Sequence, residues 1–283
     1  MSFHYFFLKI AHTENRLLHR TQQITNTIVK LPRPVRIKVA GQKICAETLD
    51  RIVSLWLRKF TSMERFELKL WTEIIQPGMV VADIGANLGF YTLLAASRIG
   101  SSGWIHAFEP DPENCALLAR SIKANGYKNV TTYQVAIADR IGEAFLYLRK
   151  EHRGDHRIYQ HGQFKMSYIQ VPLTTLDSVF SDSKRLDMVK IDIQGAEWMA
   201  ILGMKSLIAE NPQIKIFTEF WPDAIIKSGG NPKEFLRLIH NFGLQIQNIN
   251  DKSERLEKLS DSEILEICRS SGDTNLLLYR QNN

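Results

Sequence analysis

The sequence predicts an α/β protein whose mostly parallel sheet is wound outward in both directions from its first strand. Three observations predict this fold. An apolar run over Val80–Ile84 leads into a glycine turn, a helical pattern and a second apolar run that ends at Glu109. Three further apolar runs alternate with helical or polar stretches, as expected of βα units. The last two strand-like runs, Gly243–Ile249 and Asn275–Tyr279, do not continue this series and predict an antiparallel hairpin at the C-terminal edge.

The first part of the chain predicts a cap that precedes the sheet. Residues 1–30 have a helical pattern that ends at Leu31–Pro34, because proline does not continue a helix. Val35–Val39 then alternates between apolar and polar residues and predicts one strand of a small hairpin. We therefore expect residues 1–64 to form a helical and hairpin extension, and residues 65–283 to form the main domain.

Local capping chemistry marks the helix ends of the main domain. Gly100 and Gly126 each follow a helical pattern and suit the left-handed conformation that closes a helix. Asp111–Glu113 provides a cap, a first-turn proline and an early acid, and Ser260–Glu263 is a capping box. The other expected elements are a helix at Thr61–Gln76, helices from about Leu88, Gly195 and Asn231, extended segments at Phe145–Leu148 and Tyr168–Val171, and strands at Trp104–Phe108, Val130–Ile137, Leu186–Asp192 and Ile214–Phe217.

The composition is that of an ordinary globular chain with an uneven distribution of charge. Of 283 residues, 44% are hydrophobic and 23% are charged, which suffices for one large core. Residues 1–79 hold 13 of the 36 basic residues and only 6 of the 30 acidic ones, so the net charge of +6 originates there. We interpret this segment as a solvated basic cap, with contact to an anionic surface as the alternative. A nucleic-acid partner is not expected, because aromatic residues are not interleaved with the basic ones.

Cysteine usage and hydropathy predict a cytoplasmic protein. Cys45, Cys115 and Cys268 are scattered, and their spacing indicates neither a zinc site nor a disulfide framework. The apolar run at Met1–Ile10 is short and interrupted by polar residues, unlike a secretory signal. No apolar run reaches the length of a transmembrane segment.

The glycine turn and the acids at the strand ends predict a site for an adenosine-bearing cofactor at the carboxyl edge of the sheet. Gly85 and Gly89 allow a sharp turn that approaches a ligand closely, and Glu109 can accept hydrogen bonds from ribose hydroxyls. The spacing of the two glycines differs from the dinucleotide pattern G-x-G-x-x-G, and Asp83 precedes the first glycine by two residues. Both features favour a nucleoside that carries an ammonium group and no pyrophosphate. S-adenosylmethionine (SAM) fits this description.

Four motifs carry a resemblance to a known family: Val81–Gly89, Ala107–Asp111, Val171–Asp177 and Val189–Glu197. From about residue 65 to 280 the chain resembles the FkbM family of SAM-dependent methyltransferases. The resemblance implies the Rossmann-like fold of class I methyltransferases and methyl transfer, usually to a hydroxyl oxygen of a sugar or natural product. It also implies cofactor contacts at Asp83, Gly85, Asn87, Gly89 and Glu109. Asp139 matches the position that holds the adenine amino group, and a turn residue before Gly142 is an equal alternative for it. Position 194 is Gln where many relatives carry Glu, which argues against an essential carboxylate there.

Methyl transfer to a neutral hydroxyl requires alignment and a group that takes the proton of the acceptor. Asp192 ends the fourth predicted strand and Glu219 follows the fifth, so both open onto the same edge of the sheet. For Asp192 we favour a catalytic role, and for Glu219 a catalytic and a structural role are equally supported. Lys190 lies on the same face of its strand as Asp192, and we favour a structural ion pair for it.

The polar loop between the two extended segments contains His152, His156 and His161. Their spacing in a loop without nearby cysteine does not indicate zinc, so no metal ligands are predicted, although a divalent ion stays open. We interpret His156 as a base or hydrogen-bond donor on a lid that faces the substrate, with Arg157 binding an anionic group. A solvated loop with incidental histidines is an equal alternative.

These inferences predict a SAM-dependent methyltransferase of the EC 2.1.1 type that O-methylates a small molecule or a glycan. One alternative is an NAD(P)-dependent oxidoreductase, against which the missing middle glycine and the two closing strands count. The other is a non-catalytic SAM-binding module, which Gln194 keeps open. The sequence gives no indication of the oligomeric state.

Overall fold

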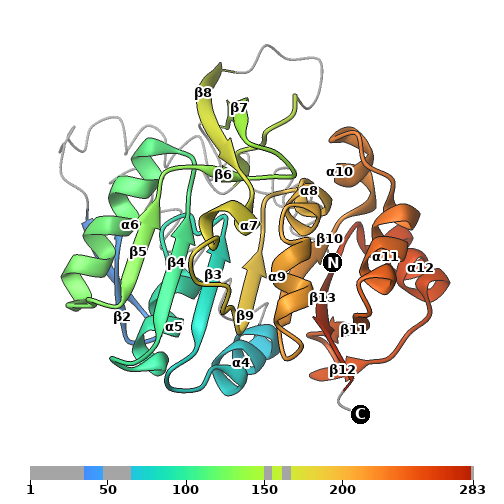
Figure 1. Cartoon of the computed structure of the whole chain (residues 1–283), viewed down its shortest axis with the longest axis horizontal. Coiled ribbons are helices and arrows are strands. Elements are labelled where there is room, and N and C mark those ends of the chain that lie inside the picture. The colour runs from blue at the N-terminus through green and yellow to red at the C-terminus, as the bar shows by residue number, and fades with distance from the viewer. Residues whose placement is uncertain (1–34, 47–64, 150–154, 161–166, 282–283) are drawn as a thin grey trace, which may run out of the picture.

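The computed structural model describes residues 35–46, 65–149, 155–160 and 167–281 (Figure 1). The helix predicted over residues 1–30 and the start of the one predicted from Thr61 lie outside these residues. The described residues form an eight-stranded sheet, a two-stranded hairpin and a separate three-stranded sheet.

The central sheet has the order β12-β11-β13-β10-β9-β3-β4-β5. From β3 the chain builds outward through β4 and β5, then returns to the other side of β3 for β9 and β10, all in parallel. The parallel strands are β3 (Val80–Ile84), β4 (Trp104–Phe108), β5 (Val130–Tyr133), β9 (Met188–Ile191) and β10 (Lys215–Phe220). The antiparallel edge consists of β13 (Thr274–Tyr279), β11 (Gln245–Asn250) and β12 (Arg255–Glu257). The predicted doubly wound sheet with an antiparallel C-terminal edge is confirmed.

Helices cover both faces of this sheet, because successive strand residues point to opposite sides. In β3, Val81 enters one core, whereas Ala82 and Ile84 enter the other. The first core is covered by α4 (Arg65–Ile74), α5 (Phe90–Ile99) and α6 (Pro112–Asn125). The second is covered by α7 (Leu176–Val179), α8 (Glu197–Leu202), α9 (Lys205–Glu210), α10 (Pro222–Lys227), α11 (Pro232–Asn241) and α12 (Asp261–Ser271).

The predicted helix caps are present. The Asp111 carboxylate accepts hydrogen bonds from the N–H groups of Glu113 and Asn114 at 2.9 and 2.8 Å. Ser260 and Glu263 form the reciprocal capping box at the start of α12. Gly126 closes α6 with a φ of 77°. These local patterns therefore position the loops that follow β4 and α6.

The N-terminal hairpin packs directly on the main domain. Strands β1 (Val35–Val39) and β2 (Gln42–Ala46) pair antiparallel, as predicted. The Cys45 N–H donates to the buried Ser121 Oγ of α6 at 2.8 Å. The division of the chain at residue 64 stays a prediction.

The third predicted strand, Val130–Ile137, is divided in the structure. Its first part is β5, whereas β6 (Ala136–Ile137) leaves the central sheet and pairs with β8 (Ser167–Thr174). Strand β7 (Gly142–Leu148) completes this small sheet, which stands above the central sheet in Figure 1. No glycine, proline or charged residue separates the two parts, so the sequence did not indicate that the pairing partner changes. The short elements α7, α10 and β12 were also not predicted.

Candidate functional site

A cavity opens at the carboxyl edge of the sheet, where the strand order reverses between β3 and β9. Ligands of open α/β sheets bind at such reversal points. The polar lining comes from the turns after β3, β4 and β9 and from residues 155–160, and consists of Gly85, Asn87, Glu109, Asp192, Gln194 and His156. The apolar walls include Phe108, Val135, Ile137, Leu146 and Ile158.

Glu109 is the most rigidly held acid of this cavity. Its side chain is buried, and its two carboxylate oxygens accept hydrogen bonds from the N–H groups of Asn87 (2.8 Å) and Asp111 (3.0 Å). Burial raises the pKa of Glu109 to about 7, against the opposing effect of these N–H groups. The structure thus places a fixed acceptor of hydrogen bonds at the predicted ribose position, although the cofactor contact itself stays a prediction.

Gly85 and Gly89 both have a left-handed backbone and lie where two segments of the chain pack closely, Gly85 against backbone and Gly89 against a side chain. Gly85 has a φ of 83°, and a Cβ there would lie 2.0 Å from the carbonyl oxygen of Asp192. Gly89 has a φ of 91°, and a Cβ would lie 2.3 Å from Leu118 Cδ1. Gly85 therefore lets the turns after β3 and β9 touch, and Gly89 lets α5 begin against α6. Gly85 lines the cavity and Gly89 does not, and a direct contact of either glycine with a cofactor stays a prediction.

Asp83 and Asp139 lie outside the residues that line the cavity. The Asp83 carboxylate is buried and accepts a hydrogen bond from Thr92 Oγ1 of α5 at 2.5 Å. Burial raises its pKa to about 6, with Thr92 and Lys190 opposing the shift. Asp139 lies at the surface beyond β6 and pairs with Arg140 at 2.9 Å. Their roles as cofactor contacts stay predictions.

Asp192 is the cavity-facing member of a buried ion network. Lys190 Nζ lies 3.6 Å from Asp192 Oδ2 but 3.3 Å from Glu67 Oε1 of α4. Glu67 also accepts a hydrogen bond from the Tyr91 hydroxyl at 3.0 Å and one from the Asn275 amide. Burial raises the pKa of Glu67, and the Lys190 charge opposes that shift. The network anchors Lys190, whereas the Asp192 side chain is 36% exposed.

Glu219 does not line the cavity, and its catalytic role stays a prediction. Its carboxyl group is buried beside Asp273, and burial together with the charges of Asp273 and Asp192 raises its pKa well above the usual value. A raised pKa favours the protonated carboxyl group, which can donate a hydrogen bond.

His156 lines the cavity and is oriented through both ring nitrogens. Nδ1 accepts a hydrogen bond from the Arg149 N–H at 3.1 Å, and Nε2 lies 3.7 Å from Asp111 Oδ2. With Nδ1 used as an acceptor, the neutral ring carries its proton on Nε2. This arrangement favours the donor role over the base role, and both stay predictions. His152 and His161 lie outside the described residues, and the described part of the chain holds no cluster of three metal-ligating side chains.

Arg157 is buried, with 1% of its side chain exposed. Its guanidinium binds the Asp155 carboxylate, with 2.7 Å between Nε and Oδ1, and lies 4.9 Å from the ring centroid of Trp221. These contacts hold Arg157 between Asp155 and Trp221 and fix the conformation of residues 155–160. The predicted contact with an anionic group stays a prediction.

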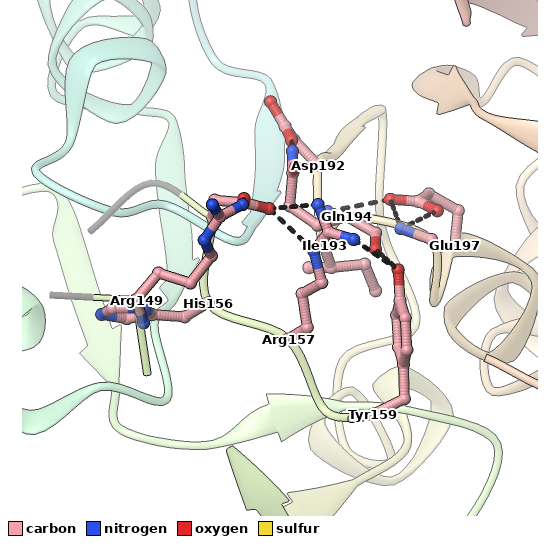
Figure 2. Close-up of polar contacts among 10 residues, drawn as sticks. Arg149, His156, Arg157, Tyr159, Asp192, Ile193, Gln194 and Glu197 are labelled. Carbon is pink, nitrogen blue, oxygen red and sulfur yellow. Dashed lines mark hydrogen bonds and ion pairs between the residues drawn. The ribbon is translucent and has the colours of Figure 1, made fainter. Parts of the chain in front are cut away.

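Glu197 holds the turn after β9 through hydrogen bonds to its backbone. It is fully buried at the start of α8 and accepts hydrogen bonds from the N–H groups of Ile193 and Gly195, both at 2.9 Å. Figure 2 shows its carboxylate turned toward the turn that carries Gln194. Burial raises the pKa of Glu197 to about 7.

The raised pKa of Glu197 predicts a pH-dependent contribution to stability. A buried carboxyl group with a raised pKa stabilises the fold below its unfolded pKa, and this contribution is lost as the pH rises through about 7. The free energy of unfolding of Glu197→Gln, minus that of the wild type, should therefore increase by about 2 kcal/mol from pH 4.5 to pH 8. Urea denaturation of both proteins across this range measures the difference. The exposed Glu73→Gln serves as the control, and equal pH profiles for wild type and Glu197→Gln would refute the assignment.

The comparisons with known proteins identify one matching family. The sequence model of the "Methyltransferase FkbM domain" matches residues 83–246. No curated protein sequence matches the chain.

Solved structures of methyltransferases are also similar. An FkbM methyltransferase from Methylobacillus flagellatus KT is 15% identical, with a TM-score of 0.45, and the match covers 75% of this chain and 50% of that one. A putative methyltransferase from Streptococcus mutans in complex with SAH (S-adenosylhomocysteine) is 6% identical, with a TM-score of 0.46 and coverage of 77% and 98%. A SAM-dependent O-methyltransferase from Thermotoga maritima is 14% identical, with a TM-score of 0.42 and coverage of 89% and 79%. The chain thus spans half the length of the first of these proteins.

Proposed function

The chain belongs to the FkbM methyltransferase domain family, and we propose that it transfers the methyl group of SAM to a hydroxyl oxygen of a sugar or natural product. The observation that carries this proposal is the cavity at the β3–β9 reversal point. It is lined by both the fixed Glu109 carboxylate and the more exposed Asp192 carboxylate. The first acid suits a cofactor ribose, and the second suits an acceptor hydroxyl.

The chemistry of the cavity fits SAM better than a dinucleotide. The apolar walls suit an adenine ring, and Glu109 can accept hydrogen bonds from vicinal hydroxyls. Among the residues that the structure describes, the lining includes two carboxylates and no lysine or arginine, which favours a ligand without a pyrophosphate. When bound, SAM supplies an electrophilic methyl group on a sulfonium that is its own leaving group.

The residues of the chain then have to align the acceptor and take its proton. Asp192 can accept the hydroxyl proton at its carboxylate, because its side chain is partly exposed and lies at the cavity. The Nε2 hydrogen of His156, which also lines the cavity, can donate to the acceptor or to the cofactor. Alignment of this kind can contribute several kcal/mol to lowering the barrier.

Isothermal titration with SAM, SAH and NAD tests the cofactor assignment. We expect SAM and SAH to bind, with NAD showing no heat of binding at the same concentrations. Binding of NAD with no binding of SAM or SAH would instead support an oxidoreductase. Purified protein can also be checked for SAH that copurifies with it.

An acceptor assay with methyl-labelled SAM tests the reaction. The panel contains methyl glycosides, polyhydroxylated small molecules and, as a separate arm, RNA. We expect label on a glycoside or small-molecule hydroxyl. Label on RNA would contradict the proposed acceptor class, and SAM binding without label on any substrate would favour a non-catalytic binding module.

The Asp192→Asn variant tests the assigned base. The amide keeps the size of the side chain but does not accept a proton at neutral pH. We expect at least a tenfold loss of turnover, with SAM affinity within about threefold of wild type. Normal turnover in the variant would remove Asp192 from this role. The exposed Asp182→Asn is a control for the effect of one lost charge.

The cytoplasm is our proposed compartment. The three cysteines are free and buried, as suits a reducing environment. None of the helices that the structure describes has both the length and the apolarity needed to cross a membrane. Fractionation of cells that express the tagged protein would test this location.

A further inference from the structure

The turn after β9 has an unusual backbone at Gln194, two residues after the assigned base. Gln194 has a φ of 58°, in the left-handed region that residues with a Cβ rarely adopt. Such strain costs about 1–3 kcal/mol and persists only where surrounding contacts enforce it. Here Glu197 holds the N–H groups of Ile193 and Gly195 on one side.

On the other side, Tyr159 holds the carbonyl of Gln194. Its hydroxyl donates to the Gln194 backbone oxygen at 2.7 Å and accepts a hydrogen bond from Arg157 Nη1 at 3.2 Å. Arg157 is itself fixed by Asp155 and by the ring of Trp221. Burial raises the pKa of Tyr159 to about 12, so the phenol keeps the proton that it donates. Figure 2 shows Tyr159 reaching from residues 155–160 to this turn.

The strained turn directs the Gln194 amide at Asp192. Gln194 Nε2 donates to Asp192 Oδ1 at 2.9 Å, while Lys190 Nζ lies 3.6 Å from Asp192 Oδ2. The two donors approach different oxygens, so the carboxylate is held from both sides. A glutamate at position 194 would offer no such donor and would place a like charge against Asp192.

We propose that Gln194 is a positioning residue, whose amide, set by the Tyr159 hydroxyl, orients the Asp192 carboxylate at the cavity. This inference rests on the proposed function and deepens it, because it gives a role to the residue that donates a hydrogen bond to the assigned base. It also gives a physical reason for an amide at this position: the donor is needed, and a second carboxylate is not. Residues 155–160 then contribute to the site through Tyr159 as well as through His156.

Three variants separate positioning from structural support. Gln194→Gly removes the amide and also relieves the left-handed backbone, so the melting temperature should stay within about 2 °C of wild type. Gln194→Glu keeps the size of the side chain and removes the donor. Tyr159→Phe removes only the hydroxyl that holds the turn. The exposed Gln170→Glu, in β8, is the matched control for the exchange of an amide for a carboxylate.

Crystal structures of these variants, with and without SAH, report the Asp192 conformer directly. We expect one Asp192 conformer bonded to residue 194 in wild type and Gln170→Glu, and a carboxylate turned toward Lys190 in Gln194→Gly and Gln194→Glu. Tyr159→Phe should show a mixture of the two. An unchanged Asp192 conformer in all three variants, or a fall in the melting temperature of Gln194→Gly of more than about 5 °C, would overturn the inference. Titration of the wild type with SAH tests the proposed function separately. The Asp192 conformer can be determined in crystals without SAH, so a failure of SAH binding would leave the test of Gln194 intact.

Discussion

Glu109→Ala is expected to weaken SAM and SAH binding by at least about 100-fold, which corresponds to about 2.7 kcal/mol. The substitution removes the acceptor proposed for the ribose hydroxyls. It also leaves the N–H groups of Asn87 and Asp111 without the carboxylate that accepts from them at 2.8 and 3.0 Å. The rim of the cavity therefore loses both a ligand contact and the group that fixes its shape. Isothermal titration of wild type and variant measures the effect.

The same carboxylate predicts how SAH affinity depends on pH. Because burial raises the pKa of Glu109 to about 7, a fraction of the group is protonated below neutrality and accepts hydrogen bonds less well. SAH affinity of the wild type should therefore increase between pH 6 and pH 8, and Glu109→Gln should remove this increase. Glu113→Ala, at an exposed position in α6, should bind as wild type does. Unchanged SAH affinity in Glu109→Ala would remove Glu109 from the cofactor site.

Gly85→Ala is expected to destabilise the fold by about 4 kcal/mol or more, enough to leave much of the protein unfolded at 37 °C. The added Cβ would lie 2.0 Å from the Asp192 carbonyl oxygen, and this contact is with backbone that has no side-chain rotation to relieve it. The left-handed φ of 83° adds about 1 kcal/mol. Thermal and urea denaturation measure the loss.

Gly126→Ala provides a matched control for the backbone term. Gly126 has a similar φ of 77°, but a Cβ there meets no atom within 4 Å. This variant should lose only about 1 kcal/mol. Equal destabilisation at the two positions would show that the contact between the turns after β3 and β9 is not what requires glycine at position 85.

Much of the fold could be predicted because its patterns are local. The strands at 80–84 and 104–108 lie where the apolar runs lie, and the Asp111 cap and the Ser260 capping box follow from short spacings. The break between β5 and β6 could not be predicted in the same way. It depends on the pairing of Ala136 with Leu173, a contact between residues far apart in the chain.

The same distinction between local patterns and long-range contacts applies to the residues of the candidate site. The sequence indicated Glu109 and Asp192 because each follows a recognisable strand, and the structure places both at one cavity. It paired Lys190 with Asp192 but missed Glu67, which lies in a helix before the sheet and reaches Lys190 only in the fold. It also missed Tyr159, whose contact with Gln194 depends on the path of the polar loop. A glutamate in the first turn of a helix, such as Glu197, is a common pattern, and its burial is what distinguishes it.

A crystal structure of the wild-type protein with SAH tests most directly whether the cavity at the β3–β9 reversal point holds the methyl donor. We expect the ribose hydroxyls within hydrogen-bond distance of the Glu109 carboxylate, the adenine against the apolar wall that includes Val135 and Ile137, and the sulfur on the side of Asp192. SAH bound elsewhere on the protein, with Glu109 contacting only the N–H groups of Asn87 and Asp111, would contradict this assignment.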